Sequence, residues 1–270
     1  MAVEVERLAD ATTAAAIKLL DAYRKEILAS LLAAEPRFQM GYRELVREID
    51  ALSAAYRGQL TLPLLNGIAA AAELGDADVL AHLRIGGIDA MSYVGVNPTL
   101  VRVASEYVAN LTEKLMAEVN AKVTSAIRLA ALGGMSFTDL VDKLGRTMNT
   151  GTFKVAKSRL ETIAQTEVAR LYNMAYYDQA NELTTRYPEV RKRWIHAASS
   201  PGFTKVQRER SRENHIRCAR VTAAEPIAMN ALFDLGGEKR ARYPHDPFLP
   251  ATETNRCRCR LMLVTPDPKG

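Results

Sequence analysis

The chain has 270 residues, of which 48% are hydrophobic and 25% charged, a composition typical of a folded globular protein with a substantial core. Its formal net charge at pH 7 is +5. This balance argues against a disordered chain or a fibre, and no apolar run in the sequence is long enough to span a bilayer. The first twenty residues lack a basic segment followed by an apolar one, so we expect no secretory signal and folding in a cytoplasm.

Helical periodicity dominates the first 185 residues, where apolar side chains recur every three or four positions among Ala, Leu, Glu, Lys and Arg. We expect helices over residues 2–32, 41–56, 62–74, 76–83, 98–132 and 153–183. A short helix should follow Ser136, because Asp139 lies three residues later, as in a capping box. The sequence therefore predicts a mainly α protein in which residues 1–185 form a long helical domain.

The pattern changes after residue 188, where Pro, Gly and Arg become frequent and the helical periodicity disappears. We expect strands over residues 190–197, 226–233 and 258–264. Residues 236–256 are rich in Pro and charge, which predicts an extended arm or a long loop. Residues 186–270 should thus form a small basic α+β module with an extended Pro-rich arm.

Positive charge is concentrated in this module. Residues 186–260 hold 16 Lys and Arg against 8 Asp and Glu, whereas the rest of the chain is slightly acidic. Six basic side chains, the basic cluster, fall within sixteen residues: Lys205, Arg208, Arg210, Arg212, Arg217 and Arg220. Such a cluster suits the phosphates of DNA, without reading of base sequence, or an acidic protein surface. The alternative is a solvated helix face whose arginines pair with Glu209 and Glu213.

Histidine and cysteine residues of the module have spacings typical of metal ligands. His215 and Cys218 are separated by two residues, and Cys257 and Cys259 alternate at the start of a predicted strand, where they would share a face. Together they offer one imidazole and three thiolates, the closed set of a structural zinc site. Zinc would stabilise a module with so little core of its own. The alternatives are three buried thiols beside a surface histidine, or His245 as a substitute if one cysteine of the pair points away.

Glu167 falls within the apolar stripe of the last predicted helix, and Arg170 lies three residues later. A buried carboxylate is costly unless it is paired, so we expect a structural ion pair. A catalytic acid is the alternative, but neither a second carboxylate nor a nucleophile accompanies Glu167. The sequence also lacks the P-loop, HExxH, GxSxG and zinc deaminase motifs. We therefore expect no catalytic residues and no enzyme.

Several short motifs follow one another in the second half of the chain: TIAQTEVARLYNMAYYDQ, RKRWIHA, SRENHIRCARV, a Pro-rich segment and NRCRCRLML. In this order, over residues 140–263, they resemble the Mu F-like head morphogenesis family of tailed phages. The matching positions are Thr166, Glu167, Arg170, Asn173, Trp194, His215, Cys218, Cys257, Arg258 and Cys259. The chain departs from the pattern at two places, because many relatives have Cys at position 215 and a His-Pro pair where this chain has Thr254 and Asn255.

The resemblance implies a minor head protein, a structural component of the virion that sits with the portal at the DNA-packaging vertex. Its expected partners are the portal protein, the major capsid or scaffolding protein, and double-stranded DNA without sequence specificity, with no membrane. It would reside in the virion, and in the host cytoplasm during assembly. The alternative is a zinc-containing nucleic-acid-binding protein or nuclease outside a virion. A nuclease, however, needs a metal with an open position, and the predicted ligand set is closed.

Overall fold

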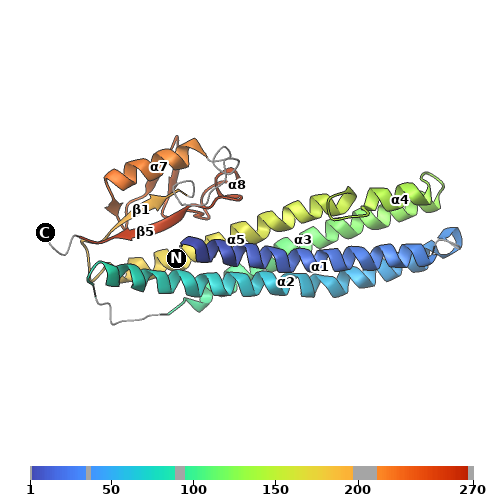
Figure 1. Ribbon diagram of the computed structural model, residues 1–270, viewed down its shortest axis with the longest axis horizontal. Coiled ribbons are helices and arrows are strands. Elements are labelled where there is room, and N and C mark those ends of the chain that lie inside the picture. The colour runs from blue at the N-terminus through green and yellow to red at the C-terminus, as the bar shows by residue number, and fades with distance from the viewer. Residues whose placement is uncertain (1, 35–37, 89–94, 197–211, 267–270) are drawn as a thin grey trace. The chain divides into compact units, whose positions relative to one another are not determined.

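The computed structural model of the chain describes residues 2–34, 38–88, 95–196 and 212–266 (Figure 1). The protein is mainly helical, with small β-sheets in its C-terminal region. It divides into two compact units. Unit 1 comprises the described residues of Met1–Ala9, Gly67–Ala104 and Gln165–Gly270, and unit 2 those of Asp10–Asn66 and Ser105–Ala164. Helices α1, α2, α3 and α5 each contribute residues to both units.

The helices are α1 (Ala2–Ala34), α2 (Phe38–Ile85), α3 (Pro98–Ala131), α4 (Phe137–Leu144) and α5 (Gly151–Leu183). Their ends agree with the expected ones to within a few residues for α1, α3 and α5. Ser136 caps α4, because its hydroxyl accepts a hydrogen bond from the Asp139 N–H at 3.0 Å. The prediction of three helices between residues 41 and 83 is wrong, since α2 runs through this region without a break.

The expected breaks fell at residues 57–61 and at Gly75, both of which lie inside α2. Pro63 lies inside α2, where it removes one backbone donor without ending the helix. Gly75 lies where α2 meets α5 within unit 1, and a Cβ there would come within 2.4 Å of the Tyr172 carbonyl oxygen. The glycine therefore permits a close approach of two helix backbones, although the sequence pattern suggested a helix end.

Aromatic packing marks the core of unit 2. The ring of Tyr23 lies 5.3 Å from that of Tyr56 and 6.1 Å from that of Phe153, and these contacts join α1, α2 and α5.

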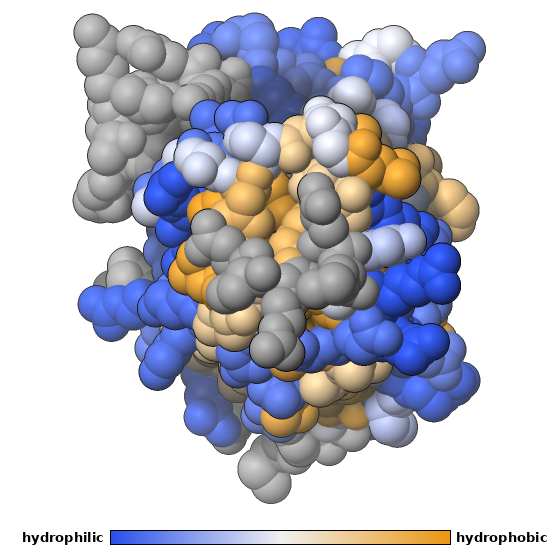
Figure 2. All heavy atoms as spheres, turned by 90° about the vertical axis from the view of Figure 1, so that its right-hand side faces the viewer, coloured by the Kyte–Doolittle hydropathy of each residue, from blue (hydrophilic) through white to orange (hydrophobic). Residues whose placement is uncertain are grey.

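Apolar side chains also gather on the surface drawn in Figure 2. Leu32 and Leu132, at the ends of α1 and α3, are 56% and 84% exposed. In the part of the chain that the structure describes, no helix has the length and apolar character needed to cross a membrane.

The C-terminal region of unit 1 contains β1 (Arg191–Ile195), α7 (Glu213–Ala224), β2 (Ile227–Ala228), β3 (Phe233–Gly236), β4 (Lys239–Ala241), α8 (Ala251–Thr254) and β5 (Arg260–Val264). Strands β2, β1 and β5 form an antiparallel sheet in that order, and β3 pairs with β4. Helix α7 packs against β1 and β3. In the pairing of β1 with β5, Trp194 lies opposite Leu261 and Lys192 lies opposite Leu263. All four of these side chains are buried.

One prediction for this region is wrong, and another holds only in one of its alternatives. Residues 226–233 do not form one strand, because a turn closed by the Ala231 N–H and the Ala228 carbonyl separates β2 from β3. Of the two forms expected for residues 236–256, the extended arm is excluded, because the segment contains β4 and α8 and buries His245 and Asp246, whereas a long loop agrees with most of its length. The Asp246 carboxylate accepts hydrogen bonds from the Arg242 and Phe248 N–H groups, which folds the Pro-rich segment into a compact loop.

The expected domain boundary lies between α5 and β1. Unit 1, however, includes the second half of α5 together with the C-terminal region. The compact units thus divide the chain at other positions, and separate domains over residues 1–185 and 186–270 stay a prediction.

Candidate metal centre

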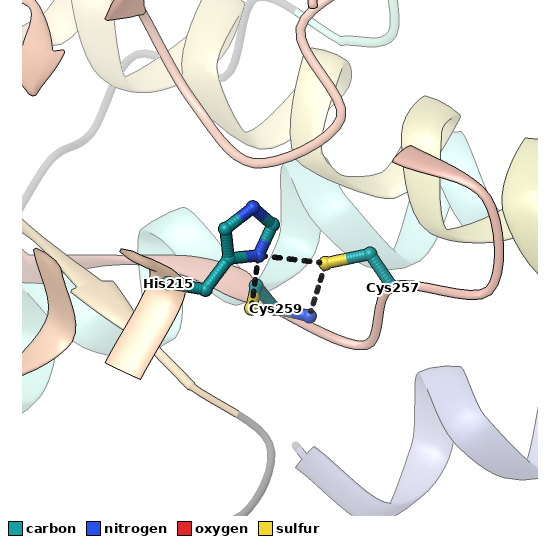
Figure 3. Close-up of side chains that lie close together, drawn as sticks. All are labelled: His215, Cys257 and Cys259. Carbon is teal, nitrogen blue, oxygen red and sulfur yellow. Dashed lines mark hydrogen bonds between the residues drawn. The ribbon is translucent and has the colours of Figure 1, made fainter. Parts of the chain in front are cut away.

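Three potential metal ligands meet inside unit 1 (Figure 3). His215 comes from α7, and Cys257 and Cys259 come from the segment that leads into β5. His215 Nδ1 lies 3.5 Å from Cys257 Sγ and 3.4 Å from Cys259 Sγ. The ligand atoms all lie within 4.8 Å of one another, and none of the three side chains is more than 4% exposed. This His-Cys-Cys group could bind a metal ion away from solvent.

Glu253 of α8 fixes the orientation of the histidine ring. Its Oε2 atom lies 2.9 Å from His215 Nε2, and the carboxylate also accepts hydrogen bonds from Asn214 and Lys239. Burial tends to raise the pKa of Glu253, but the bonds from Lys239 and Asn214 outweigh it and hold the pKa below its usual value. A charged Glu253 favours a proton on His215 Nε2, which leaves the Nδ1 lone pair facing the two sulfur atoms.

The surroundings of Cys257 favour its thiolate. The pKa of this thiol lies well below its usual range, chiefly because of a hydrogen bond from Cys259, while burial opposes the shift and His245 and His215 reinforce it. The Cys259 N–H also points at Cys257 Sγ, at a distance of 3.4 Å. The thiolate is the form of cysteine that binds metals, so these surroundings favour metal binding by Cys257.

One face of α5 holds the segment that carries the cysteines. The Thr166 hydroxyl accepts a hydrogen bond from the Arg256 N–H at 3.1 Å. Asn173 accepts from the Leu261 N–H at 2.9 Å and donates to the Cys259 carbonyl at 3.3 Å. Tyr176 accepts from the Leu263 N–H at 3.0 Å. Strand β5 is at the edge of its sheet, so these helix side chains bind the backbone groups that face away from β1.

Trp194 of β1 packs against the other side of the group. Its ring lies 5.2 Å from that of His215 in an edge-on arrangement, and 5.3 Å from that of Phe233. Its backbone N–H donates to the Thr222 hydroxyl at 3.0 Å, which ties β1 to α7. The indole therefore helps to set the position of the histidine and to exclude water from it.

Glu167 is buried on α5 and pairs with Arg170 at 2.6 Å, as the spacing of the two residues predicts. Burial raises the pKa of Glu167, although Arg170 and His245 act in the opposite direction. The ion pair therefore lies close to His245, on the same helix that holds the cysteine segment.

Cys218, the fourth predicted ligand, does not belong to the group formed by the other three. It is buried on α7, where desolvation, with a contribution from Asp234 of β3, raises the pKa of its thiol to about 12. Its position three residues after His215 puts it on a similar side of the helix, but its surroundings favour a neutral thiol.

Three of the four histidines of the chain surround the cysteine pair. His196 follows β1 and interacts electrostatically with both Cys257 and His215. His245 lies in the Pro-rich loop, beside Cys257. Sequence reasoning named His245 only as a substitute and missed Glu253, because these residues approach the group from separate segments without a local motif. The only available signal was the number of histidines and carboxylates in a short irregular region.

The basic cluster is only partly described. Lys205, Arg208 and Arg210 lie outside the described residues, whereas Arg217 and Arg220 are exposed on α7. The Arg212 guanidinium donates to the Thr252 and Asn255 carbonyls at 2.6 and 2.8 Å. It therefore holds the turn that connects α8 with the cysteine segment, and its part in binding a polyanion stays a prediction.

Comparison with known proteins finds no matching family model, no matching curated protein and no matching solved structure.

Proposed function

We propose that this chain is a minor head protein of a tailed phage, a structural component that acts in head morphogenesis beside the portal and the packaged DNA. The sequence resemblance to the Mu F-like family suggests this role, and one structural observation supports it. The positions that carry the resemblance are spread from residue 166 to residue 259, yet many of them meet around the His-Cys-Cys group. The motifs thus lie in one packed arrangement, as motifs of a shared family architecture would.

A structural zinc ion fits this arrangement best. In a tetrahedral site with usual zinc–nitrogen and zinc–sulfur bond lengths, a nitrogen and a sulfur ligand lie ~3.6 Å apart. The His215 nitrogen lies 3.5 and 3.4 Å from the two sulfur atoms, close to that value. Thiolate and imidazole donors favour zinc over the hard cations calcium and magnesium. The burial of all three ligands supports a role in folding, without a catalytic step.

The second part of the proposal is that the basic cluster contacts DNA backbones or an acidic portal surface. Arg217 and Arg220 are exposed residues of α7, which supports it. If about four phosphates are engaged, the slope of log K against log salt should be near ~−3.6. Because such contacts neutralise phosphates only, no base preference is expected.

Detection of the protein in particles tests the head assignment directly. An antiserum against the chain is applied to density-gradient fractions of a lysate in which the source phage or prophage assembles. We expect the chain to sediment with heads and to crosslink to the portal protein. A chain found only in the soluble fractions, throughout assembly, would contradict the assignment.

Filter binding of duplex DNA at several salt concentrations tests the role of the basic cluster. The Arg217→Ala/Arg220→Ala variant should bind more weakly and with a shallower salt slope than the wild type. Lys122→Ala/Arg128→Ala, which removes two exposed charges from α3, is the matched control. An equal loss of DNA affinity in both double variants would show that only net charge matters. Unchanged DNA binding by Arg217→Ala/Arg220→Ala would leave the portal surface as the partner of the basic cluster.

A further inference from the structure

The His-Cys-Cys group supplies three ligands, whereas a closed structural zinc site has four. The fourth position is therefore open to assignment among the neighbouring side chains. Cys218 is outside the group, in surroundings that favour its neutral thiol, and Glu253 is engaged with His215, Asn214 and Lys239. The remaining candidates with a suitable donor atom beside Cys257 are His196 and His245.

His245 has the features of a ligand side chain without its ion. It is only 1% exposed, and among the described residues neither ring nitrogen makes a well-formed hydrogen bond, its one weak polar interaction being with the Cys257 thiol. A buried imidazole in this state forgoes hydrogen bonds that it would make in water, which is costly. Its ring interacts electrostatically with the Cys257 sulfur on one side and with the Glu167 carboxylate on the other. A metal ion beside Cys257 would satisfy one of the two nitrogens.

The backbone at His245 is held in an unusual conformation. Its φ angle is +66°, in the left-handed region that residues other than glycine seldom adopt. The neighbouring Asp246 fixes this conformation, because its carboxylate binds the Arg242 N–H and guanidinium and the Phe248 N–H. Such strain persists only where the surrounding structure enforces it, and it often occurs at ligand sites. Here it turns the imidazole into the interior of unit 1.

We propose that His245 is the fourth ligand of a His2Cys2 metal site formed with His215, Cys257 and Cys259, and that Glu253 is the positioning residue of this site. The inference rests on the zinc ion of the proposed function and refines its ligand set. The His245 nitrogens lie outside the cluster in which the ligand atoms of His215, Cys257 and Cys259 are within 4.8 Å of one another. Binding of the metal ion therefore draws the His245 ring towards Cys257 and His215. Glu253 acts through His215, whose Nε2 proton it accepts.

X-ray absorption of the zinc-loaded full chain and the visible spectrum of its cobalt form test the assignment without a mutation. We expect one ion per chain with two sulfur and two nitrogen donors. Three sulfur donors would overturn the proposal in favour of Cys218, and an oxygen donor from water in the fourth position would overturn it as well. A chain that binds neither zinc nor cobalt would refute the zinc site itself, which is a distinguishable result.

Competition with a chromophoric chelator then measures the affinity of variants for zinc. Loss of a residue that hydrogen-bonds a metal ligand typically weakens metal affinity tenfold to hundredfold. Glu253→Gln should weaken zinc binding by a factor in this range, and His245→Gln, which removes a ligand, by a larger factor. Cys218→Ser is the matched control, and its affinity should stay at the wild-type level. Unchanged affinity in His245→Gln, or a large loss in Cys218→Ser, would overturn the assignment. If His245→Gln fails to fold, the donor count of the wild type still separates a His2Cys2 site from one completed by Cys218 or by water.

Discussion

Replacing Lys192 with methionine should change how the stability of the protein depends on pH. The Lys192 side chain is fully buried in β1, and its ammonium group donates to the Arg242 carbonyl at 2.8 Å. It also lies 4.9 and 5.0 Å from the ring centres of Tyr177 and Phe233. Burial is the main cause that lowers the pKa of Lys192 from 10.5 to about 7, while Asp246 opposes the shift and Arg242 adds to it.

The magnitude follows from proton linkage. In the folded state Lys192 releases its proton near pH 7, whereas the unfolded chain keeps it until about pH 10.5, so the unfolded state binds more protons in between. The contribution of Lys192 to stability is therefore greatest above pH 10.5 and is lost as the pH falls through 7. A gap of about 3.5 between the two pKa values corresponds to about 5 kcal/mol in total, of which about 2 kcal/mol is gained between pH 7 and pH 9.

Urea unfolding of the wild type and Lys192→Met at pH 7, 8 and 9 measures this gain. The difference in the free energy of unfolding should rise by about 2 kcal/mol in favour of the wild type over that interval, because all other titrating groups are common to both proteins. Lys122→Met, at an exposed lysine of α3, controls for the loss of one positive charge. A difference that stays constant between pH 7 and pH 9 would refute the reasoning and place the ammonium group in contact with water.

Further substitutions test the packing of unit 1. Gly75→Ala should destabilise the protein by about 1–3 kcal/mol, because its Cβ would collide with the backbone of α5. The Cβ of Gly58→Ala on the same helix would meet nothing within 4 Å, so this substitution should stabilise the protein by about 1 kcal/mol. If thermal unfolding showed stability changes of the same sign for both variants, the close approach of the helices at Gly75 would be contradicted. Asn173→Ala should cost about 2–3 kcal/mol and speed amide exchange in β5, unlike Asn181→Ala at an exposed position of α5. Glu167→Ala should cost about 3 kcal/mol, and an unchanged melting temperature would show that the ion pair adds no stability.

The helical part of the fold could be predicted because its signals are local. Periodicity located α1, α3 and α5, and the hydroxyl of Ser136 identified the start of α4. The same local reasoning failed in α2, where it placed breaks around Gly58 and at Gly75, two glycines that the helix contains. The role of Gly75 depends on a tertiary contact, the approach of α5, which no spacing in the sequence reveals.

The candidate site could be predicted only in part, for a similar reason. The alternation of Cys257 and Cys259 correctly indicated that both sulfur atoms face one place, which His215 also reaches. The short spacing between His215 and Cys218 suggested a second pair, but the sulfur of Cys218 is not part of the group. The environment of a side chain depends on segments that pack against its helix, and for Cys218 these include Asp234 of β3.

The Pro-rich segment could be predicted only as an arm or a loop, because its composition indicates only that it forms neither a long helix nor a long strand. Its order comes from Asp246, whose carboxylate binds backbone groups on both sides of the loop. The segment then places His245 in the interior and delivers Glu253 to His215. A region expected to form an arm or a loop thus provides much of the wall around the candidate metal site.

The arrangement also explains how residues far apart in the sequence can act as one unit. Thr166 and Asn173 hold the backbone on either side of Cys257 and Cys259, so the positions of the sulfur atoms depend on α5. A metal ion would add bonds from α7 to the same segment through His215. Because all of these residues belong to unit 1, removal of the ion should first loosen β5 and the Pro-rich loop, whereas the aromatic core of unit 2 has no ligand to lose. The metal would then serve to fasten the C-terminal region to α5, which is the function expected of a structural site in a module with little core.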